Sequence, residues 1–368
     1  MNRIIDFLKK EIVLSVSFVL ALISMFFVPP SEKYFDYIDF RTLGLLFSLM
    51  TIMAGLNKMG IFRLLAKNLL NKAKTMRGVT LLLVLLCFFS SMLITNDVAL
   101  ITFVPFSVVL LKLANKQNRM IFVVTLETIA ANLGSMLTPI GNPQNLYLFS
   151  AYNMSISDFF YTIAPYAMLS LGLLVIFLLF SDKSKLANLG DREEVIFDKR
   201  LLTMYAVLFA IALLSVFRVL NYIVLLAVVI VFVLIFDRKV ILKVDYSLLF
   251  TFVFLFIFIG NLGNIAQINS WLSEIVGGNE VVVGVLASQV FSNVPAAILL
   301  SGFTCNAAAL MIGVNIGGLG TLIASMASLI SFKFIQKESV SIAKYLGVFT
   351  LLNVVFLAAN LALWVVVK

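Results

Sequence analysis

The chain alternates long uncharged apolar runs with short charged segments. A helix needs about 20 apolar residues to cross a bilayer. Runs of that order predict ordinary spanning helices near residues 12–28, 42–57, 159–181, 201–217, 219–236, 246–264 and 345–367. The pattern indicates an all-α polytopic membrane protein.

One further apolar tract has the wrong length for a simple span. Residues 78–111 are charged only at Asp97. As a single helix they would be roughly 50 Å long, which is too long for one crossing and short for two. We predict a re-entrant hairpin over these residues, with its tip at the TND sequence of 95–97.

A second tract, 281–332, carries no charge and would form roughly 78 Å of helix. It is interrupted by SNVP at 292–295 and by GGLGT at 317–321. We predict a hairpin over 281–302 followed by a broken helix over 306–332.

A third stretch, ANLGSMLTPIGNPQNLYLF at 131–149, holds two prolines, two glycines and four amides within an uncharged run. It predicts a broken helix over 120–150. Non-helical backbone at membrane depth survives only where protein or a water-filled cavity satisfies its polar groups. Paired broken helices of this kind are typical of the substrate sites of secondary transporters.

The two halves of the chain repeat the same order of features. Placing residues 131–149 on 314–332 matches Asn132 with Asn315 and Gly134 with Gly317. Upstream, LITNDVALI lies on VFSNVPAAI, and LLFSLMTIMAGLNKMG lies on LLFTFVFLFIFIGNLG. Each half contains two spans, a hairpin, a broken span and a final span.

The extra span at 201–217 reverses the orientation of the second half. We therefore predict two inverted repeats, each with a re-entrant hairpin and a broken transmembrane helix. The first repeat covers 1–181, a charged cytoplasmic linker plus the extra span covers 182–218, and the second repeat covers 219–368.

The distribution of basic residues predicts the topology. With the N-terminus inside and the hairpins returning to the side they left, all 27 lysines and arginines lie in inside loops except Lys33, Arg41, Arg218 and Lys368. This favours a multi-pass protein of the cytoplasmic (inner) membrane with a cytoplasmic N-terminus and an outside C-terminus. The net charge of +9 is then charge of cytoplasmic loops, so we expect membrane lipid and no nucleic acid as partners.

Composition strengthens this interpretation. The chain is 62% hydrophobic and 12% charged, whereas soluble domains are roughly 45–50% apolar and about 25% charged. It contains no histidine, and its two cysteines are single residues in apolar tracts. A histidine proton relay, a histidine or thiolate metal site and a disulfide are therefore not expected.

The predicted breaks place helix N-termini near the middle of the membrane. Helices should begin at about Val98 and Pro295, after the hairpin tips, and again where Asn142 and Thr321 could cap the second parts of the broken helices. Free N–H groups at such ends bind a carboxylate or oxyanion without a buried base. We expect the substrate site to comprise Thr95, Asn96, Thr138, Asn142, Gln144, Asn145, Ser292, Asn293, Gly318 and Thr321. The alternative is that the hydroxyl and amide residues only cap helices.

Two carboxylates, Asp97 and Glu127, lie in membrane tracts, where an acid is costly and indicates function. Both belong to the first half, so we expect that half to hold the coupling ion, with Asn132 beside it. The alternatives are an N-cap role for Asp97 and a structural role for Glu127. No cofactor is expected; the coupling ion is sodium or a proton, and the one metal considered is sodium near Asn96 and Asp97.

The segments SSMLITNDVALITFVPF, ANLGSMLTPIGNPQNLYLF and FSNVPAAILLSGF resemble the citrate-transporter-like and arsenite-permease branch of the ion transporter superfamily. That group also contains divalent-anion/sodium symporters and sodium/proton antiporters. The resemblance implies transport, a two-repeat fold and a homodimer. In the symporter branch, Ser-Asn-Thr motifs at both tips hold sodium and anion; here the third positions are Asp97 and Val294, which puts a symmetric pair of sodium sites in doubt.

The leading hypothesis is a secondary active transporter for a small organic or inorganic anion, coupled to sodium or protons. A sodium/proton antiporter and an arsenite or antimonite exporter are the alternatives among transporters. An intramembrane enzyme or a non-transporting scaffold is the alternative from another class. We expect no enzyme, because no Ser/His, metal or paired-acid arrangement is present.

Overall fold

The computed structural model describes residues 11–60, 75–179, 184 and 198–367. All regular elements in these ranges are helices. Apart from Ser184, the charged part of the predicted linker, 182–197, lies outside the described residues.

Six helices in the described ranges are long and apolar enough to cross a membrane. They are α4 (Phe40–Lys58), α6 (Met76–Ile94), α10 (Ile156–Leu179), α11 (Lys199–Val216), α13 (Tyr246–Gly263) and α19 (Ile342–Val367). Their lipid-facing character is visible in the many exposed large apolar side chains. These helices confirm an all-α, multi-pass membrane protein.

Shorter elements complete the chain. Two apolar helices, α2 (Ile12–Phe27) and α12 (Tyr222–Phe236), occupy predicted spans. Helix α12 begins later than predicted because Arg218 adopts a φ of 64° and Asn221 caps the helix by accepting from the N–H of Ile223. The short helices outside the hairpins and broken helices are α3 (Tyr34–Tyr37), η1 (Gln117–Arg119), η2 (Arg238–Lys243) and α14 (Ala266–Val276). Helix α14 meets the next helix of the chain at an angle of 109°.

Both predicted hairpins contain two helices separated by one residue. Thr95 separates α6 from α7 (Asn96–Leu113), and Ser292 separates α15 (Glu280–Phe291) from α16 (Asn293–Ser301). Thr95 has φ 72° and ψ 153°, and Ser292 has φ 72° and ψ 154°. This region is essentially reserved for glycine, at a cost of about 1–3 kcal/mol for other residues, and such residues cluster at functional sites. The two tips therefore share one strained local structure.

Both predicted broken helices are also interrupted. Helix α8 (Met120–Ser135) is separated by 136–142 from α9 (Pro143–Ala151). Helix α17 (Ala307–Ile316) is separated by 317–325 from α18 (Met326–Ile335). These interruptions are called the first break and the second break below.

Each hairpin tip is bonded to the break of its own half at equivalent positions. The Asn96 N–H donates to the Gly141 carbonyl at 3.1 Å, and the Asn293 N–H donates to the Ala324 carbonyl at 3.0 Å. Positions 141 and 324 coincide in the sequence repeat. The same backbone bond thus fixes each tip against its break.

Two equivalent glycines allow the helices of each half to touch. A Cβ on Gly134 would lie 2.1 Å from the Phe88 carbonyl oxygen on α6, and one on Gly317 would lie 2.9 Å from the Val285 Cα on α15. Backbone atoms cannot rotate away as a side chain does. Glycine is therefore required where each broken helix crosses the first arm of its hairpin.

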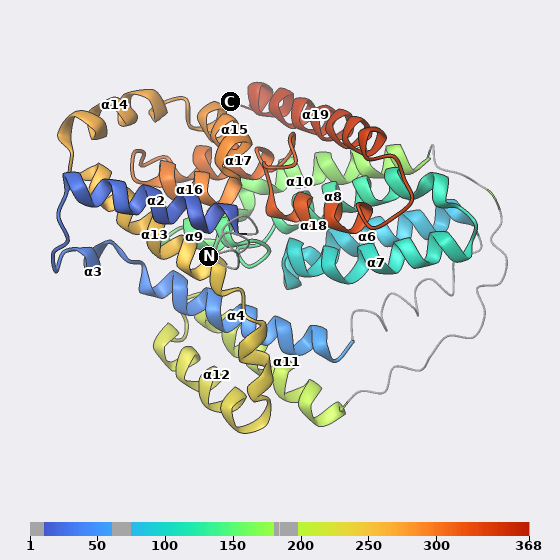
Figure 1. Cartoon of the computed structure of the whole chain (residues 1–368), viewed down its shortest axis with the longest axis horizontal. Helices are drawn as coiled ribbons and strands as arrows, with labels where there is room; N and C mark the ends of the chain where they lie inside the picture. The colour runs from blue at the N-terminus through green and yellow to red at the C-terminus, as the bar shows by residue number, and fades with distance from the viewer. Residues whose placement is uncertain (1–10, 61–74, 180–183, 185–197, 368) are drawn as a thin grey trace, which may run out of the picture.

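The two halves are interlocked rather than side by side. Helix α2 of the first half packs on α13 of the second, while α12 of the second packs on α4 of the first. In the same way α7 contacts α18, and α16 contacts α9. Figure 1 shows α2 lying along α13, which is far away in sequence, with α4, α11 and α12 grouped at one side. The inverted relation of the halves and the division into domains stay predictions.

Buried hydrogen bonds are exchanged between the halves at equivalent positions. The Asn132 Oδ1 accepts from the Ser325 hydroxyl at 3.0 Å, and the Asn315 Oδ1 accepts from the Asn142 Nδ2 at 3.2 Å. The Asn315 Nδ2 also donates to the Asn145 Oδ1 at 2.7 Å. Each half thus holds the start of the other half's short helix.

Adding a methyl group at Gly134 tests the close contact of α6 and α8. We expect Gly134→Ala to lower the free energy of unfolding by about 1–3 kcal/mol, because overpacking against backbone forces helices apart. Gly172→Ala on α10 is the matched control, since a Cβ there meets nothing within 4 Å. Thermal unfolding in detergent measures both, and equal midpoints for the two variants would contradict the proposed contact.

The exchanged hydrogen bonds predict a second stability effect. Asn315→Ala should cost about 2 kcal/mol, because it leaves the buried Oδ1 of Asn145 without its donor and removes one of the two acceptors of the Asn142 Nδ2. The control is Asn118→Ala, at an exposed position of η1. If both variants unfold at the wild-type temperature, the exchanged bonds do not hold the halves together.

Candidate functional site

The two tips, the start of α9 and the end of the second break meet around one small cavity. It has a volume of about 10 Å3, and residues of both halves line it. Its polar lining includes Asn96 and Asp97 from the first tip, Gln144 from α9, Asn293 from the second tip and Ser325 from the second break. We call this space the midpoint cavity.

Four helices begin at the midpoint cavity. Its lining includes the first residue of α7, α9, α16 and α18, which are Asn96, Pro143, Asn293 and Met326. The N–H groups at the start of a helix have no partner within it and carry partial positive charge. No lysine or arginine within the described ranges lines this cavity.

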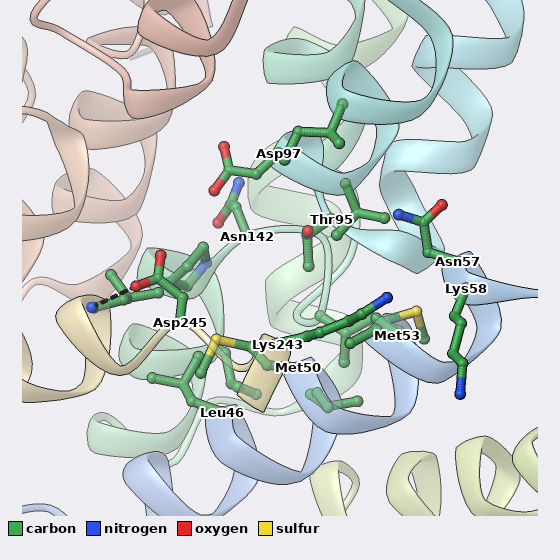
Figure 2. Close-up of a pocket in the computed structure, with 18 of the residues that line it drawn as sticks. Leu46, Met50, Met53, Asn57, Lys58, Thr95, Asp97, Asn142, Lys243 and Asp245 are labelled. Atoms are coloured by element: carbon green, nitrogen blue, oxygen red, sulfur yellow. Dashed lines mark hydrogen bonds between the residues drawn. The ribbon is translucent and has the colours of Figure 1, made fainter. Parts of the chain in front are cut away.

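A larger cavity of about 520 Å3 adjoins the midpoint cavity, because Asp97, Pro143 and Leu248 line both. We call it the access cavity. Its polar side chains near the helix starts are Thr95, Asp97 and Asn142, and its exposed charged residues are Lys58, Lys243 and Asp245. Figure 2 shows these side chains around the cavity, with Lys243 extended across it in this view.

In the first half, amide side chains replace missing backbone hydrogen bonds. Asn142 caps α9, as predicted, by accepting from the Asn145 N–H at 2.9 Å. The Asn145 Nδ2 donates to the carbonyls of Met136 at 2.9 Å and Thr138 at 3.2 Å. The Thr138 hydroxyl donates to the carbonyl of Met92. The first break is therefore held from both sides.

In the second half, a glutamine performs the same task from the hairpin. The Gln289 Nε2 donates to the carbonyls of Gly317 at 2.8 Å and Leu319 at 3.0 Å, and its Oε1 accepts from the Thr321 N–H at 3.0 Å. The side chain of Asn293 lies against Gly318, where its Nδ2 would be 2.9 Å from an added Cβ. The predicted site residues Asn293 and Gly318 are thus neighbours.

The expected cap of α18 and the expected helix starts at the tips differ from the structure, and the alternative of a capping role fails at Thr95 and Ser292. The N-cap of α18 is Ser325 rather than Thr321, and Thr321 is exposed. Thr95 and Ser292 hold N-cap positions but make no capping bond, because their backbone conformation at the tip turns the side chain elsewhere. Helices α7 and α16 begin two residues earlier than predicted, directly after these tips.

Several buried polar atoms in this region have no partner among the described residues. They are Asp97 Oδ1, Asn132 Nδ2 and Gln144 Oε1. Asn132 uses its Oδ1 fully, accepting from Asn96 Nδ2 at 3.2 Å and from Ser325. Buried polar atoms are normally paired, so two acceptors and one donor remain for an ion, water or ligand.

Glu127 is separate from this group. It is fully buried and lines neither cavity, and its only hydrogen bond among the described residues is accepted from the Ser107 hydroxyl on α7. The structure therefore brings Asp97 to the helix starts and leaves Glu127 between α7 and α8. In the described ranges no three His, Cys, Asp or Glu residues are grouped to hold a metal ion.

The far ends of α9 and α16 are bonded together. Tyr147 and Ser301 join their hydroxyls at 2.7 Å, and the Tyr152 hydroxyl lies 3.0 Å from the Ser301 carbonyl and 2.9 Å from that of Thr304. Arg218 donates to the Phe149 carbonyl at 2.9 Å and lies over that ring. Both helices run from the midpoint cavity to this closed end.

Sequence reasoning missed five contributors: Asn315, Ser325, Gln289, Lys243 and Asp245. The repeat already pointed to two of them, because Asn315 is the equivalent of Asn132 and Ser325 that of Asn142. The other three had no such signal. Lys243 and Asp245 belong to a short charged connection, and only the fold brings them to a cavity.

Comparison with known proteins agrees with the geometry. Residues 4–309 match the family model described as citrate transporter. The chain is 33% identical over 352 residues to an uncharacterized transporter of Methanocaldococcus jannaschii, covering 94% of this chain and 95% of that protein. It is 32% identical over 326 residues to the inner membrane protein YbiR of Escherichia coli, covering 84% and 83%.

A more distant match is partial. The rice silicon efflux transporter LSI3 is 33% identical over 162 residues, which cover 43% of this chain and 32% of that protein. The long matches and the family model together cover the spans, the tips and the first break. This chain belongs to the citrate transporter family of membrane transporters.

Proposed function

We propose that the protein is a secondary active transporter that moves a small organic or inorganic anion across the cytoplasmic membrane by alternating access. The observation that carries the proposal is the meeting of four helix starts at one cavity without a lysine or arginine in its lining. Partial positive charge at helix starts holds an anion without a fixed buried base. Such a site can release its substrate, which a strong ion pair would oppose.

Asp97 supplies the coupling. Its carboxylate lines both cavities, and one buried oxygen has no partner among the described residues. Two like charges about 4 Å apart repel by about 4 kcal/mol near a protein surface. Substrate anion and ionised Asp97 therefore exclude each other unless sodium or a proton neutralises the acid.

Coupling is then reciprocal, since the bound ion raises the affinity for the anion by the same factor as the bound anion raises the affinity for the ion. The unpaired Gln144 Oε1 faces the same space and is a second oxygen suited to a cation. This supports the first half as the half that holds the coupling ion. Glu127 is the second candidate for the coupling residue, and it would act by binding a proton at a distance from the substrate.

The cavities indicate which side is open. Access is from the end bearing Lys58 and Lys243, which the distribution of basic residues places inside, while Tyr147, Tyr152 and Ser301 close the other end. We therefore propose that this conformation is the inward-facing state. Transport requires these far-end bonds to break when the cavity closes inside.

A sodium/proton antiporter is the second candidate. The unpaired oxygens of Asp97 and Gln144 suit a cation without any anion. The third candidate is an exporter of arsenite or antimonite, and the partial match to the rice silicon efflux transporter supports an exporter of this general kind. An enzyme is not proposed, because the match is to a transporter family.

Partners remain proposals. We propose a homodimer in the cytoplasmic membrane, formed through apolar faces outside the hairpins and breaks, with lipid covering the remaining apolar surface. Sodium or a proton is the proposed coupling ion, and no other cofactor is proposed.

Uptake by purified protein in liposomes tests the function. We expect accumulation of at least one small anion from a panel of citrate, C4-dicarboxylates, monocarboxylates, sulfate and phosphate, and collapse of the sodium or proton gradient should abolish it. Sodium flux or arsenite flux alone, with no anion accumulated, would favour the second or third candidate and reject the proposal.

Removing the charge of Asp97 tests the coupling. Asp97→Asn keeps the shape but cannot bind sodium or a proton in the same way, so gradient-driven uptake should fall at least tenfold while expression and folding are retained. Val294→Thr, at the equivalent position of the second tip, is the matched control and should change uptake little. Wild-type uptake by Asp97→Asn, with unchanged dependence on sodium and pH, would reduce Asp97 to a structural residue.

A further inference from the structure

We propose that the access cavity accepts an organic anion with a single negative charge, and that Lys243 is the residue that receives this charge at the entrance. The inference rests on the proposed anion transport and specifies its substrate class. Three observations carry it: the charges of the lining, the chemistry of the walls and the size of the space.

Four charged side chains among the residues that the structure describes line the access cavity: Lys58, Lys243, Asp97 and Asp245. Lys58 is already neutralised, since its Nζ lies 2.8 and 2.9 Å from the two carboxylate oxygens of Asp237. Asp237 is itself buried and also accepts from the Tyr205 hydroxyl at 3.3 Å. Lys58 is therefore a structural cation that ties α4 to the start of η2.

Lys243 is the cation that remains. It is exposed at the end of η2, and no ion-pair partner faces it among the residues that the structure describes. The carboxylates in the lining of the access cavity are Asp97 and Asp245. Asp245 is the N-cap of α13, where its Oδ1 accepts from the Leu248 N–H at 2.9 Å. With the coupling ion on Asp97, Lys243 is the one unpaired base that the described lining offers to a substrate charge.

The single unpaired base in the described lining also disfavours a substrate with two or three negative charges. With one carboxylate at Lys243, the second and third would face Asp245 and the apolar wall, and the helix starts would offer them only partial positive charge in place of a base. An unpaired charge that loses water is costly, and like charges opposite one another suppress the wrong ligand.

The walls indicate an organic body rather than an inorganic ion. Between the charged entrance and the polar helix starts, the lining is apolar and includes Leu49, Met50 and Met53 of α4 and Ile101 of α7. Methionine adapts its shape to irregular hydrocarbon ligands. The volume of about 520 Å3 lies within the range of roughly 300–1,000 Å3 that small-molecule sites occupy. Sulfate or phosphate would leave most of it unfilled.

Three six-carbon acids of increasing charge test the substrate class. Hexanoate, adipate and propane-1,2,3-tricarboxylate carry one, two and three charges at pH 7.5. Binding to the full-length protein is measured calorimetrically in mild detergent, at constant ionic strength, with sodium present and divalent cations chelated. We expect hexanoate to bind about tenfold more tightly than adipate, and the tricarboxylate more weakly still. Equal or tighter binding of the tricarboxylate overturns the inference.

Substitutions at Lys243 test its role. Lys243→Gln should weaken hexanoate binding about tenfold and remove most of its salt dependence, whereas Lys243→Arg should retain both. Lys239→Gln is the matched control, because Lys239 is exposed on the same short helix and lines neither cavity. Unfolding midpoints without ligand should be equal for all three variants. Wild-type binding by Lys243→Gln overturns the role of Lys243.

Different results would contradict the proposed substrate class and the proposed anion transport. If the wild type accumulates sulfate, phosphate or citrate but binds none of the three six-carbon acids, the proposed anion transport stands and the substrate class is wrong. If the wild type accumulates no anion under any gradient, the proposed function itself is wrong.

Discussion

Backbone that leaves a helix inside a membrane must find hydrogen-bond partners within the protein, and the rest of this structure depends on how that need is met. No water is available to pair such groups outside a cavity. Here amide side chains supply the partners: Asn145 pairs carbonyls of the first break, and Gln289 pairs carbonyls of the second. The breaks can then exist at fixed positions, and helices can begin where a substrate is held.

The same constraint explains why the halves interlock. Asn132 accepts a hydrogen bond from Ser325, which precedes α18 of the other half. Asn315 accepts one from Asn142, which precedes α9 of the other half. Neither half can then place its own helix start without the other. A cavity made in this way is lined by both halves. That arrangement is suited to alternating access.

The sequence was informative where polar or helix-breaking residues interrupt apolar runs. Tips and breaks are predictable because a TND or GNPQN sequence at membrane depth has few structural explanations. Capping was less predictable, since both N-cap hydroxyls at the tips depend on an unusual backbone conformation that sequence does not reveal. Lys243 and Asp245 were beyond reach, because a charged connection between spans looks like ordinary solvated loop until the fold closes it around a cavity.

The backbone of the two halves is more alike than their side chains, and this difference bears on function. Equivalent tips have the same dihedral angles and the same bond to the break. Yet Asp97 corresponds to Val294, and the brace of the first break comes from α9 while that of the second comes from the hairpin. Backbone geometry alone creates two similar sets of helix starts, which suits one anion held between them. Because the carboxylate is present in one set only, the asymmetry supports the proposal that the first half holds the coupling ion.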